Sequence, residues 1–177
     1  SSDLPVLSED GELLFVKAGE IRCCNITGVV KGKRGRAGEL RGSFVNNIVI
    51  GSIDKNTTTG IYGKINNSFK EKYDLKKIET GTAVMGDAYI YSTVSDGEIK
   101  KYDISIIKTD YSNKENKNFV IKIEDEELIE ITGGIVQGMS GSPIVQNGKL
   151  VGAVTHVFLN DSTRGFGIAI ENMLKNG

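Results

Sequence analysis

The sequence predicts an all-β fold of two β-barrels with a short helix at the C-terminus. Short segments rich in β-branched and apolar residues recur along the 177-residue chain, glycine-containing turns separate them, and helix signals are sparse. Such a pattern is typical of a barrel or a sandwich, and the length allows two small barrels that share a core. A polar stretch at residues 66–80 marks the expected boundary. We therefore expect an N-terminal barrel in residues 1–70 and a C-terminal barrel in residues 71–177.

The N-terminal half contains four expected strands before a short helical turn. The strands are expected at residues 12–17, 20–30, 44–53 and 58–65, and the helical turn within residues 66–77. Cys23 and Cys24 are adjacent, and neighbouring strand residues point to opposite faces, so a disulfide between them would be strained. We expect two free cysteines that behave as small apolar side chains, one directed inward and one outward.

A basic stretch interrupts this half at residues 31–41. It holds five cations with glycines between them, namely Lys31, Lys33, Arg34, Arg36 and Arg41. One interpretation is a loop that contacts an anion or a nucleic acid. No aromatic residues interleave and the chain has a net charge of −1, so nucleic acid is not an expected partner. A solvated, mobile loop is the favoured interpretation, and a docking loop or a self-cleavage site are further alternatives.

The C-terminal half contains two clear hairpins. The first joins strands at residues 82–94 and 98–108 through Asp96-Gly97, and the second joins residues 143–146 and 149–158 through Asn147-Gly148. Further strands are expected at residues 119–123 and 166–170. A helical turn with Asp125 as its N-cap is expected at residues 125–129, and the final helix at residues 171–174.

The composition excludes several classes of function. Hydrophobic residues make up 38% of the chain and charged residues 25%, which is typical of a globular domain. No apolar run approaches the roughly 20 residues that span a bilayer, and the first five residues lack the features of a signal peptide. One histidine and one cysteine pair do not have metal-ligand spacing. We expect no metal and no cofactor.

The segment Gly138-Met139-Ser140-Gly141-Ser142-Pro143 carries the chemistry. A serine hydroxyl is a poor nucleophile that needs a nearby base and amide donors for the oxyanion. Glycines allow the backbone to turn its N–H groups toward the bond under attack. We predict that Ser140 is the nucleophile, that the amides of Gly138 and Ser140 form the oxyanion hole, and that Gly141 keeps the space before the hydroxyl open. Pro143 begins a strand, where its missing N–H is tolerated.

This segment resembles the nucleophile loop of chymotrypsin-like peptidases, Gly-Asp-Ser-Gly-Gly-Pro. The hairpin that follows at residues 143–158 matches the family as well, so the resemblance implies a chymotrypsin-like double β-barrel. It also implies that the second strand of the hairpin lines the substrate cleft, with Thr155 and His156 facing Ser140. A further wall of the cleft would come from Gly165, Phe166 and Gly167.

A closer resemblance extends over nearly the whole chain. The runs KRGRAGELRG at 33–42, GIYGK at 60–64, GGIVQGMSGSPIVQNGKLVGAVTHV at 133–157 and NDSTRGFGI at 160–168 look like those of the stage IV sporulation protein B peptidases. The resemblance implies a serine endopeptidase of sporulation signalling that cuts itself. It would also cleave a membrane-associated regulator of an intramembrane protease, and so release a sigma factor. These peptidases act between the forespore and mother-cell membranes. The membrane anchor and PDZ domain of the family are not found in this sequence.

The base and the acid of a catalytic triad are harder to assign. His156 is the one histidine, yet it lies on the strand expected to line the cleft, whereas a base must come from the opposite wall. The family register places the base histidine a few residues before Ser1. Either the chain was cut there, or it is described only from a later residue, or this homologue is degenerate. Without this histidine, the chain itself would cleave poorly.

The family's acid lies fifteen residues before the serine, which is Asp125 here. The alternative is that Asp125 only caps a helix, and Thr155 would then supply a supporting hydroxyl. Three functions stay open on these residues. They are an active serine endopeptidase, an inactive peptidase fold that binds protein partners, and an unrelated β-barrel binding domain.

Overall fold

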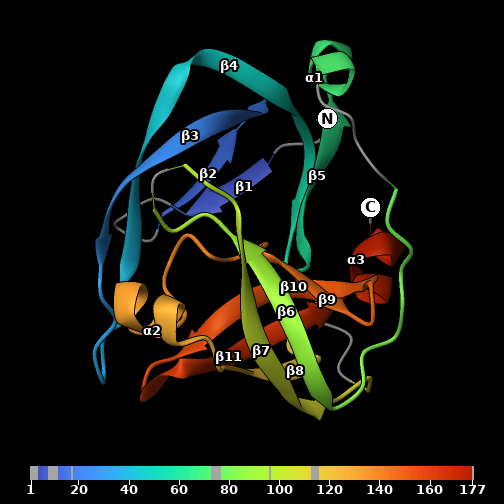
Figure 1. The fold of residues 1–177 in the computed structure, drawn as a ribbon. Helices are drawn as coiled ribbons and strands as arrows, with labels where there is room; N and C mark the ends of the chain where they lie inside the picture. Colours follow the sequence, from blue (N-terminus) through green and yellow to red (C-terminus); the bar gives the residue numbers. More distant parts are fainter. Residues whose placement is uncertain are drawn as a thin grey trace.

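The computed structural model describes residues 4–7, 12–16, 18–72, 77–95, 97–112 and 116–176. Within these residues the chain is predominantly β-stranded, which confirms the predicted fold class (Figure 1). The C-terminal half closes into a barrel, and the N-terminal half forms two smaller sheets that lie above the barrel in Figure 1.

The barrel contains six antiparallel strands in the closed order β10-β11-β8-β7-β6-β9. Their bounds are β6 (Gly86–Ser92), β7 (Lys100–Thr109), β8 (Phe119–Ile123), β9 (Pro143–Gln146), β10 (Lys149–Phe158) and β11 (Asp161–Ala169). Both predicted hairpins are present, since β6 pairs with β7 and β9 pairs with β10. The Asn147-Gly148 turn has φ values of 51° and 75°, which suit a tight hairpin connection.

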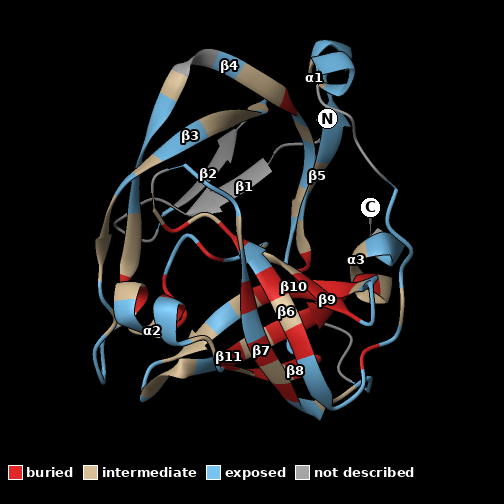
Figure 2. Cartoon of the chain, in the orientation of Figure 1, coloured by how far each residue is buried: buried red, intermediate tan, exposed pale blue. Residues whose placement is uncertain are grey.

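The core of the protein lies inside this barrel. Alternate residues of β8 point inward, and Phe119, Ile121 and Ile123 are fully buried while the residues between them are half-buried. Burying an isoleucine or phenylalanine side chain contributes roughly 2 kcal/mol, so the alternation fixes which face of each strand meets the core. Figure 2 shows the buried residues concentrated in the barrel. Among the described side chains before Ala83, no apolar one is buried.

The N-terminal half differs from the predicted barrel. Its strands are β1 (Leu4–Leu7), β2 (Leu13–Val16), β3 (Gly19–Val30), β4 (Glu39–Thr57) and β5 (Gly60–Ile65). In the described residues β1 pairs only with β2, and the long, bulged β4 pairs with β3 and β5, so these strands do not close a barrel. β3 pairs with residues 39–53 of β4 and β5 with residues 51–57, so β3 and β5 are the outer strands of an open sheet. The domain boundary near residue 70 stays a prediction.

The two cysteines of β3 are free, as expected. Cys23 is half-buried and Cys24 is exposed. Neither cysteine is fully buried, because the described apolar side chains of the sheet of β3, β4 and β5 form no buried core.

Three short helices match the predicted helical turns. They are α1 (Asn67–Lys72), α2 (Glu126–Thr132) and α3 (Ile170–Asn176). Asp125 caps α2 as predicted, and Gly133 ends this helix in the left-handed conformation. In the described part of the chain, none of the helices has the length and apolar character needed to cross a bilayer.

The turn between β10 and β11 is held by the side chain of Asp161. Its carboxylate accepts hydrogen bonds from the Thr163 hydroxyl at 2.6 Å and the Thr163 amide at 3.1 Å, and it pairs with Arg164 at 3.2 Å. The Thr163 hydroxyl bond, then the Thr163 amide bond and the charge of Arg164, hold the pKa of Asp161 below its usual value of 3.8. The negative charge of Asp161 is thus favoured in the folded state.

We expect Asp161→Asn to lower the free energy of unfolding at pH 7 by about 0.5 kcal/mol, a figure reduced because the pair with Arg164 is half-exposed. Because the folded pKa lies below the unfolded one, the contribution of Asp161 is complete above pH 3.8 and is lost as the pH falls through the folded pKa. Urea unfolding at pH 7 and at stepwise lower pH measures both effects. A difference between the proteins that grows on acidification would contradict this prediction.

Candidate active site

Ser140 lies in the loop between α2 and β9, and two backbone hydrogen bonds fix this loop to β10. The Gly141 amide donates to the Val154 carbonyl at 2.8 Å, and the Val154 amide donates to the Ser142 carbonyl at 2.9 Å. Ser140 itself is exposed. The loop therefore presents an accessible hydroxyl at a position determined by a barrel strand.

The glycines on either side of Ser140 are required by the backbone. Gly138 has a φ of 98° and Gly141 a φ of 89°, a region that other residues rarely adopt. A Cβ on Gly141 would meet nothing within 4 Å, so this position is open, as predicted. Between the glycines, Met139 is fully buried and anchors the loop in the core.

Two amides of this loop are available for a ligand. The Met139 amide donates to the Val136 carbonyl at 3.1 Å. In the described part of the chain, no protein group accepts a hydrogen bond from the amides of Gly138 or Ser140. These are the two amides, of Gly138 and Ser140, that the sequence predicts as the oxyanion hole. Its role in catalysis stays a prediction.

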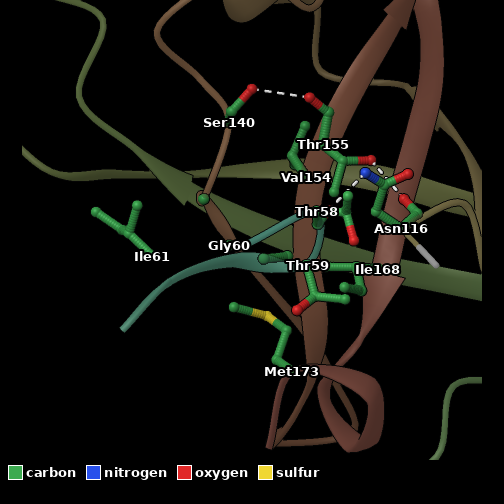
Figure 3. A pocket seen from close by; sticks show the side chains of 12 residues that line it. Thr58, Thr59, Gly60, Ile61, Asn116, Ser140, Val154, Thr155, Ile168 and Met173 are labelled. Atoms are coloured by element: carbon green, nitrogen blue, oxygen red, sulfur yellow. Dashed lines mark hydrogen bonds between the residues drawn. The ribbon is translucent and has the colours of Figure 1, made fainter. Parts of the chain in front are cut away.

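The hydroxyl of Ser140 donates to the backbone carbonyl of Thr155, with 2.8 Å between the oxygens (Figure 3). Within the described residues, no hydrogen bond joins Ser140 to His156. The imidazole is exposed, and His156 pairs with Phe166 across β10 and β11. The geometry therefore does not place His156 as the base of Ser140.

A cavity of about 320 Å³ lies on one side of Ser140. A chain of hydrogen bonds forms one wall of it, as Figure 3 shows. The Thr155 hydroxyl donates to the Asn116 carbonyl at 2.8 Å, and the Asn116 side-chain amide donates to the Thr58 carbonyl at 2.8 Å. The turn between β4 and β5 therefore lies in the same cavity wall as Ser140. No sequence motif marks Thr58 or Asn116, because only a contact between distant segments brings them here.

A second cavity, of about 350 Å³, lies on another side of Ser140. It is lined by Ala37, Ile135, Val136, Gln137, Ser140, Thr155, His156, Val157 and Leu159. Of the predicted cleft residues, Thr155 lines both cavities and His156 lines this one. The strand β10 thus borders both cavities beside Ser140.

The remaining predicted cleft residues, Gly165, Phe166 and Gly167, line neither cavity beside Ser140, and their role in the cleft stays a prediction. The Phe166 ring packs against Phe158 at 4.7 Å between centroids. A Cβ on Gly165 would lie 2.6 Å from the Cδ1 atom of Ile135, which lines the second cavity. The strand β11 pairs with β10 and is joined to the serine loop, because the Ile135 amide donates to the Ser162 carbonyl at 2.7 Å.

Asp125 acts in the structure as a helix cap. One carboxylate oxygen accepts from the Leu128 amide at 2.9 Å, and the other from the Asp103 amide at 3.4 Å. Asp125 lines neither cavity beside Ser140. This geometry favours the capping interpretation, and the role of triad acid stays a prediction.

The site contains the groups that acyl transfer to a serine requires, except for a base that contacts the Ser140 hydroxyl. An accessible hydroxyl, two available amides and cavities on two sides can receive a carbonyl carbon, its oxygen and flanking peptide groups. In the described ranges, no three or more His, Cys, Asp or Glu side chains are grouped so that they could hold a metal ion.

Comparison with known proteins agrees with this geometry. Residues 6–174 match the family described as SpoIVB peptidase S55. The structure is similar to the crystal structure of the Rv3671c protease from M. tuberculosis in its active form, with a TM-score of 0.51 and 13% sequence identity. That similarity covers 97% of this chain and 76% of the other, and it concerns the fold alone. No curated protein matches the chain.

The capping geometry gives a stability prediction for Asp125. We expect Asp125→Ala to lower the free energy of unfolding by about 1 kcal/mol, since α2 loses its N-cap, while Asp125→Asn should cost less than about 0.5 kcal/mol because asparagine caps equally well. Denaturant unfolding measures both values. Equal losses in the two variants would argue against the cap. Because the asparagine variant stays folded, unchanged labelling of Ser140 by a fluorophosphonate in that variant would assign Asp125 to the cap alone.

Proposed function

The chain belongs to the SpoIVB peptidase S55 family, and on that premise we propose that it is a serine endopeptidase with Ser140 as its nucleophile. The observation that carries the proposal is the exposed Ser140 hydroxyl beside the available amides of Gly138 and Ser140. In the reaction, Ser140 Oγ bonds to the scissile carbonyl carbon while a base takes its proton. The base then protonates the leaving amine, and water hydrolyses the acyl-enzyme.

The oxyanion of each tetrahedral intermediate would be bound by the amides of Gly138 and Ser140. Such donors are aimed before the reaction and so cost no reorganisation when charge develops, and one donor is typically worth about 10²-fold to 10³-fold in rate. The positive φ of Gly138 and the buried Met139 hold these amides in place. The cavities on two sides of Ser140 would then receive the groups that flank the scissile bond.

The base in this proposal is the histidine that the family register places a few residues before Ser1. His156 supports another role, because it lines a cavity and does not bond to Ser140. We assign His156 to the binding of substrate. The resting bond from Ser140 to the Thr155 carbonyl would break when the hydroxyl turns toward the base.

For the biological role we propose sporulation signalling, on the basis of the family. The substrates would be the protein itself and a membrane-associated regulator of an intramembrane protease, in the space between the forespore and mother-cell membranes. A second candidate is an inactive peptidase fold that binds protein partners. It is favoured by one observation, namely that the Ser140 hydroxyl bonds to a backbone carbonyl rather than to a base.

Fluorophosphonate labelling of the full-length protein, with the residues that precede Ser1, separates these two candidates. An activated serine attacks the phosphonate, whereas an unactivated one reacts slowly, so the endopeptidase proposal requires labelling of Ser140. Mass spectrometry of the labelled peptide identifies the modified residue. Absence of the label from folded full-length protein would leave the partner-binding module as the function.

We expect Ser140→Ala to abolish labelling and to lower self-cleavage by on the order of 10⁴-fold or more, because the nucleophile is removed. The fold should be unchanged, since this side chain is exposed. Ser68→Ala is a matched control. This serine is exposed on α1 and lines none of the cavities along the serine loop, so the variant should keep both activities. Self-cleavage that persists in purified Ser140→Ala protein would disprove the assignment.

A further inference from the structure

Four cations in the connection between β3 and β4 have no role in the chemistry proposed above. We call residues 31–36, with Lys31, Lys33, Arg34 and Arg36, the basic turn. All four side chains are exposed, and within the described part of the chain no carboxylate pairs with any of them. The first strand residue after the turn is Glu39, so the turn is shorter than the basic stretch of the sequence.

The basic turn is solvated, as expected, and its backbone is hydrogen-bonded to the barrel half. Lys33 and Arg36 exchange two backbone hydrogen bonds of 3.0 and 2.8 Å, which close the turn. The Gly35 amide donates to the Leu159 carbonyl at 2.7 Å, and the Gly32 amide donates to the Thr132 carbonyl at 2.9 Å. Figure 1 shows the connection between β3 and β4 beside α2. The backbone of the basic turn is therefore held at a defined place.

That place is the rim of the second cavity beside Ser140. Ala37 follows the turn directly and lines this cavity, and so does Leu159, which accepts the hydrogen bond from the turn. The loop of Ser140 is tied to the same segment, because the Gln137 amide donates to the Gly38 carbonyl and the Leu40 amide to the Gln137 carbonyl, both at 2.8 Å. The basic turn therefore adjoins residues that line the second cavity, although none of its four cations is in the lining.

No described carboxylate pairs with a cation of the basic turn. The lining of the second cavity contains neither Asp or Glu nor Lys or Arg. Near the turn, Glu39 pairs with Arg41 at 3.0 Å and Asp161 pairs with Arg164 at 3.2 Å, while Glu130 of α2 is exposed and forms no ion pair among the described residues. Like charges held together at a cleft raise the local concentration of an anionic ligand and set its orientation. With a chain net charge of −1, this positive rim is a local feature.

The cavity beyond Gly138 has a different character. Its volume is about 980 Å³, and its lining is mainly apolar and contains no charged residue. Of the cavities along the serine loop, the second cavity is the one whose lining adjoins the basic turn.

We propose that the basic turn recognises acidic side chains in the substrate, on the side of the scissile bond that enters the second cavity. An extended peptide advances about 3.3 Å per residue, so the acidic side chains lie within a few residues of the bond that is cut. That the bound peptide is a substrate rests on the proposed function. That an acidic peptide is recognised rests on the placement of the turn. The preference acts through charge, so it weakens as salt screens it.

The test measures binding of fluorescent peptides to Ser140→Ala protein, which cannot cleave them. The peptides share one sequence and carry three consecutive Glu, Gln or Lys residues. At low salt we expect the Glu peptide to bind at least about tenfold more tightly than the Gln peptide, and the difference to shrink at 1 M salt, where the Debye length is about 3 Å. Equal binding of the Glu and Gln peptides overturns the proposal.

Two triple variants locate the effect. We expect Lys33→Gln, Arg34→Gln and Arg36→Gln together to abolish the preference for Glu, while a control variant with the same change in net charge keeps it. The control replaces exposed lysines outside the basic turn, namely Lys64, Lys70 and Lys175, by glutamine. Circular dichroism checks that both variants are folded. Loss of the preference in both variants alike would attribute it to net charge and overturn the proposal.

Further arms separate this inference from the proposed function and from other anions. If Ser140→Ala protein bound anionic vesicles or duplex DNA through the basic turn more tightly than it binds the Glu peptide, the proposal that the turn recognises an acidic peptide would be overturned. Fluorophosphonate labelling of protein that retains Ser140 tests the proposed function independently. A Glu preference without labelling would contradict the proposed peptidase function and support the recognition of acidic peptides. Labelling without a Glu preference would support the peptidase function and overturn the recognition of acidic peptides.

Discussion

Two backbone hydrogen bonds between the serine loop and β10 determine the geometry of the candidate site. They run from the Gly141 amide to the Val154 carbonyl and from the Val154 amide to the Ser142 carbonyl. Because β10 is paired on both sides within a closed barrel, its backbone provides a rigid reference for the loop. The Ser140 hydroxyl, the two available amides and both adjoining cavities take their positions from this attachment.

Stability and function are distributed unequally between the two halves of the chain. The buried apolar side chains of the described residues all belong to the segment that begins at Ala83, so the barrel half supplies the core. The N-terminal sheets instead bring polar and charged segments to the site. Thr58 reaches it through Asn116 and Thr155, and the segment after the basic turn reaches it through Gln137. Besides these hydrogen bonds, Leu40 of β4 joins the halves by packing against the core of the barrel.

Hydrogen bonding also explains why the same residue types take different roles. Both oxygens of Asp125 accept from backbone amides, so this carboxylate is committed to the start of α2. Asp161 is committed in a similar way to the turn between β10 and β11. The cations of the basic turn have no such partner among the described residues, although the backbone of the turn is fixed. Groups without an internal partner are the ones available to a ligand.

Local features of this protein follow from the sequence, because neighbouring residues determine them. The turn at Asn147-Gly148, the cap at Asp125 and the glycines around Ser140 all depend on hydrogen bonds and backbone angles within a few residues. Tertiary structure alone decided that the N-terminal strands form open sheets. It alone also brought Thr58 to the cavity beside Ser140 and the basic turn to the lining of the second cavity. These placements depend on packing and hydrogen bonds between segments that are far apart in the chain, and no pattern within one segment encodes them.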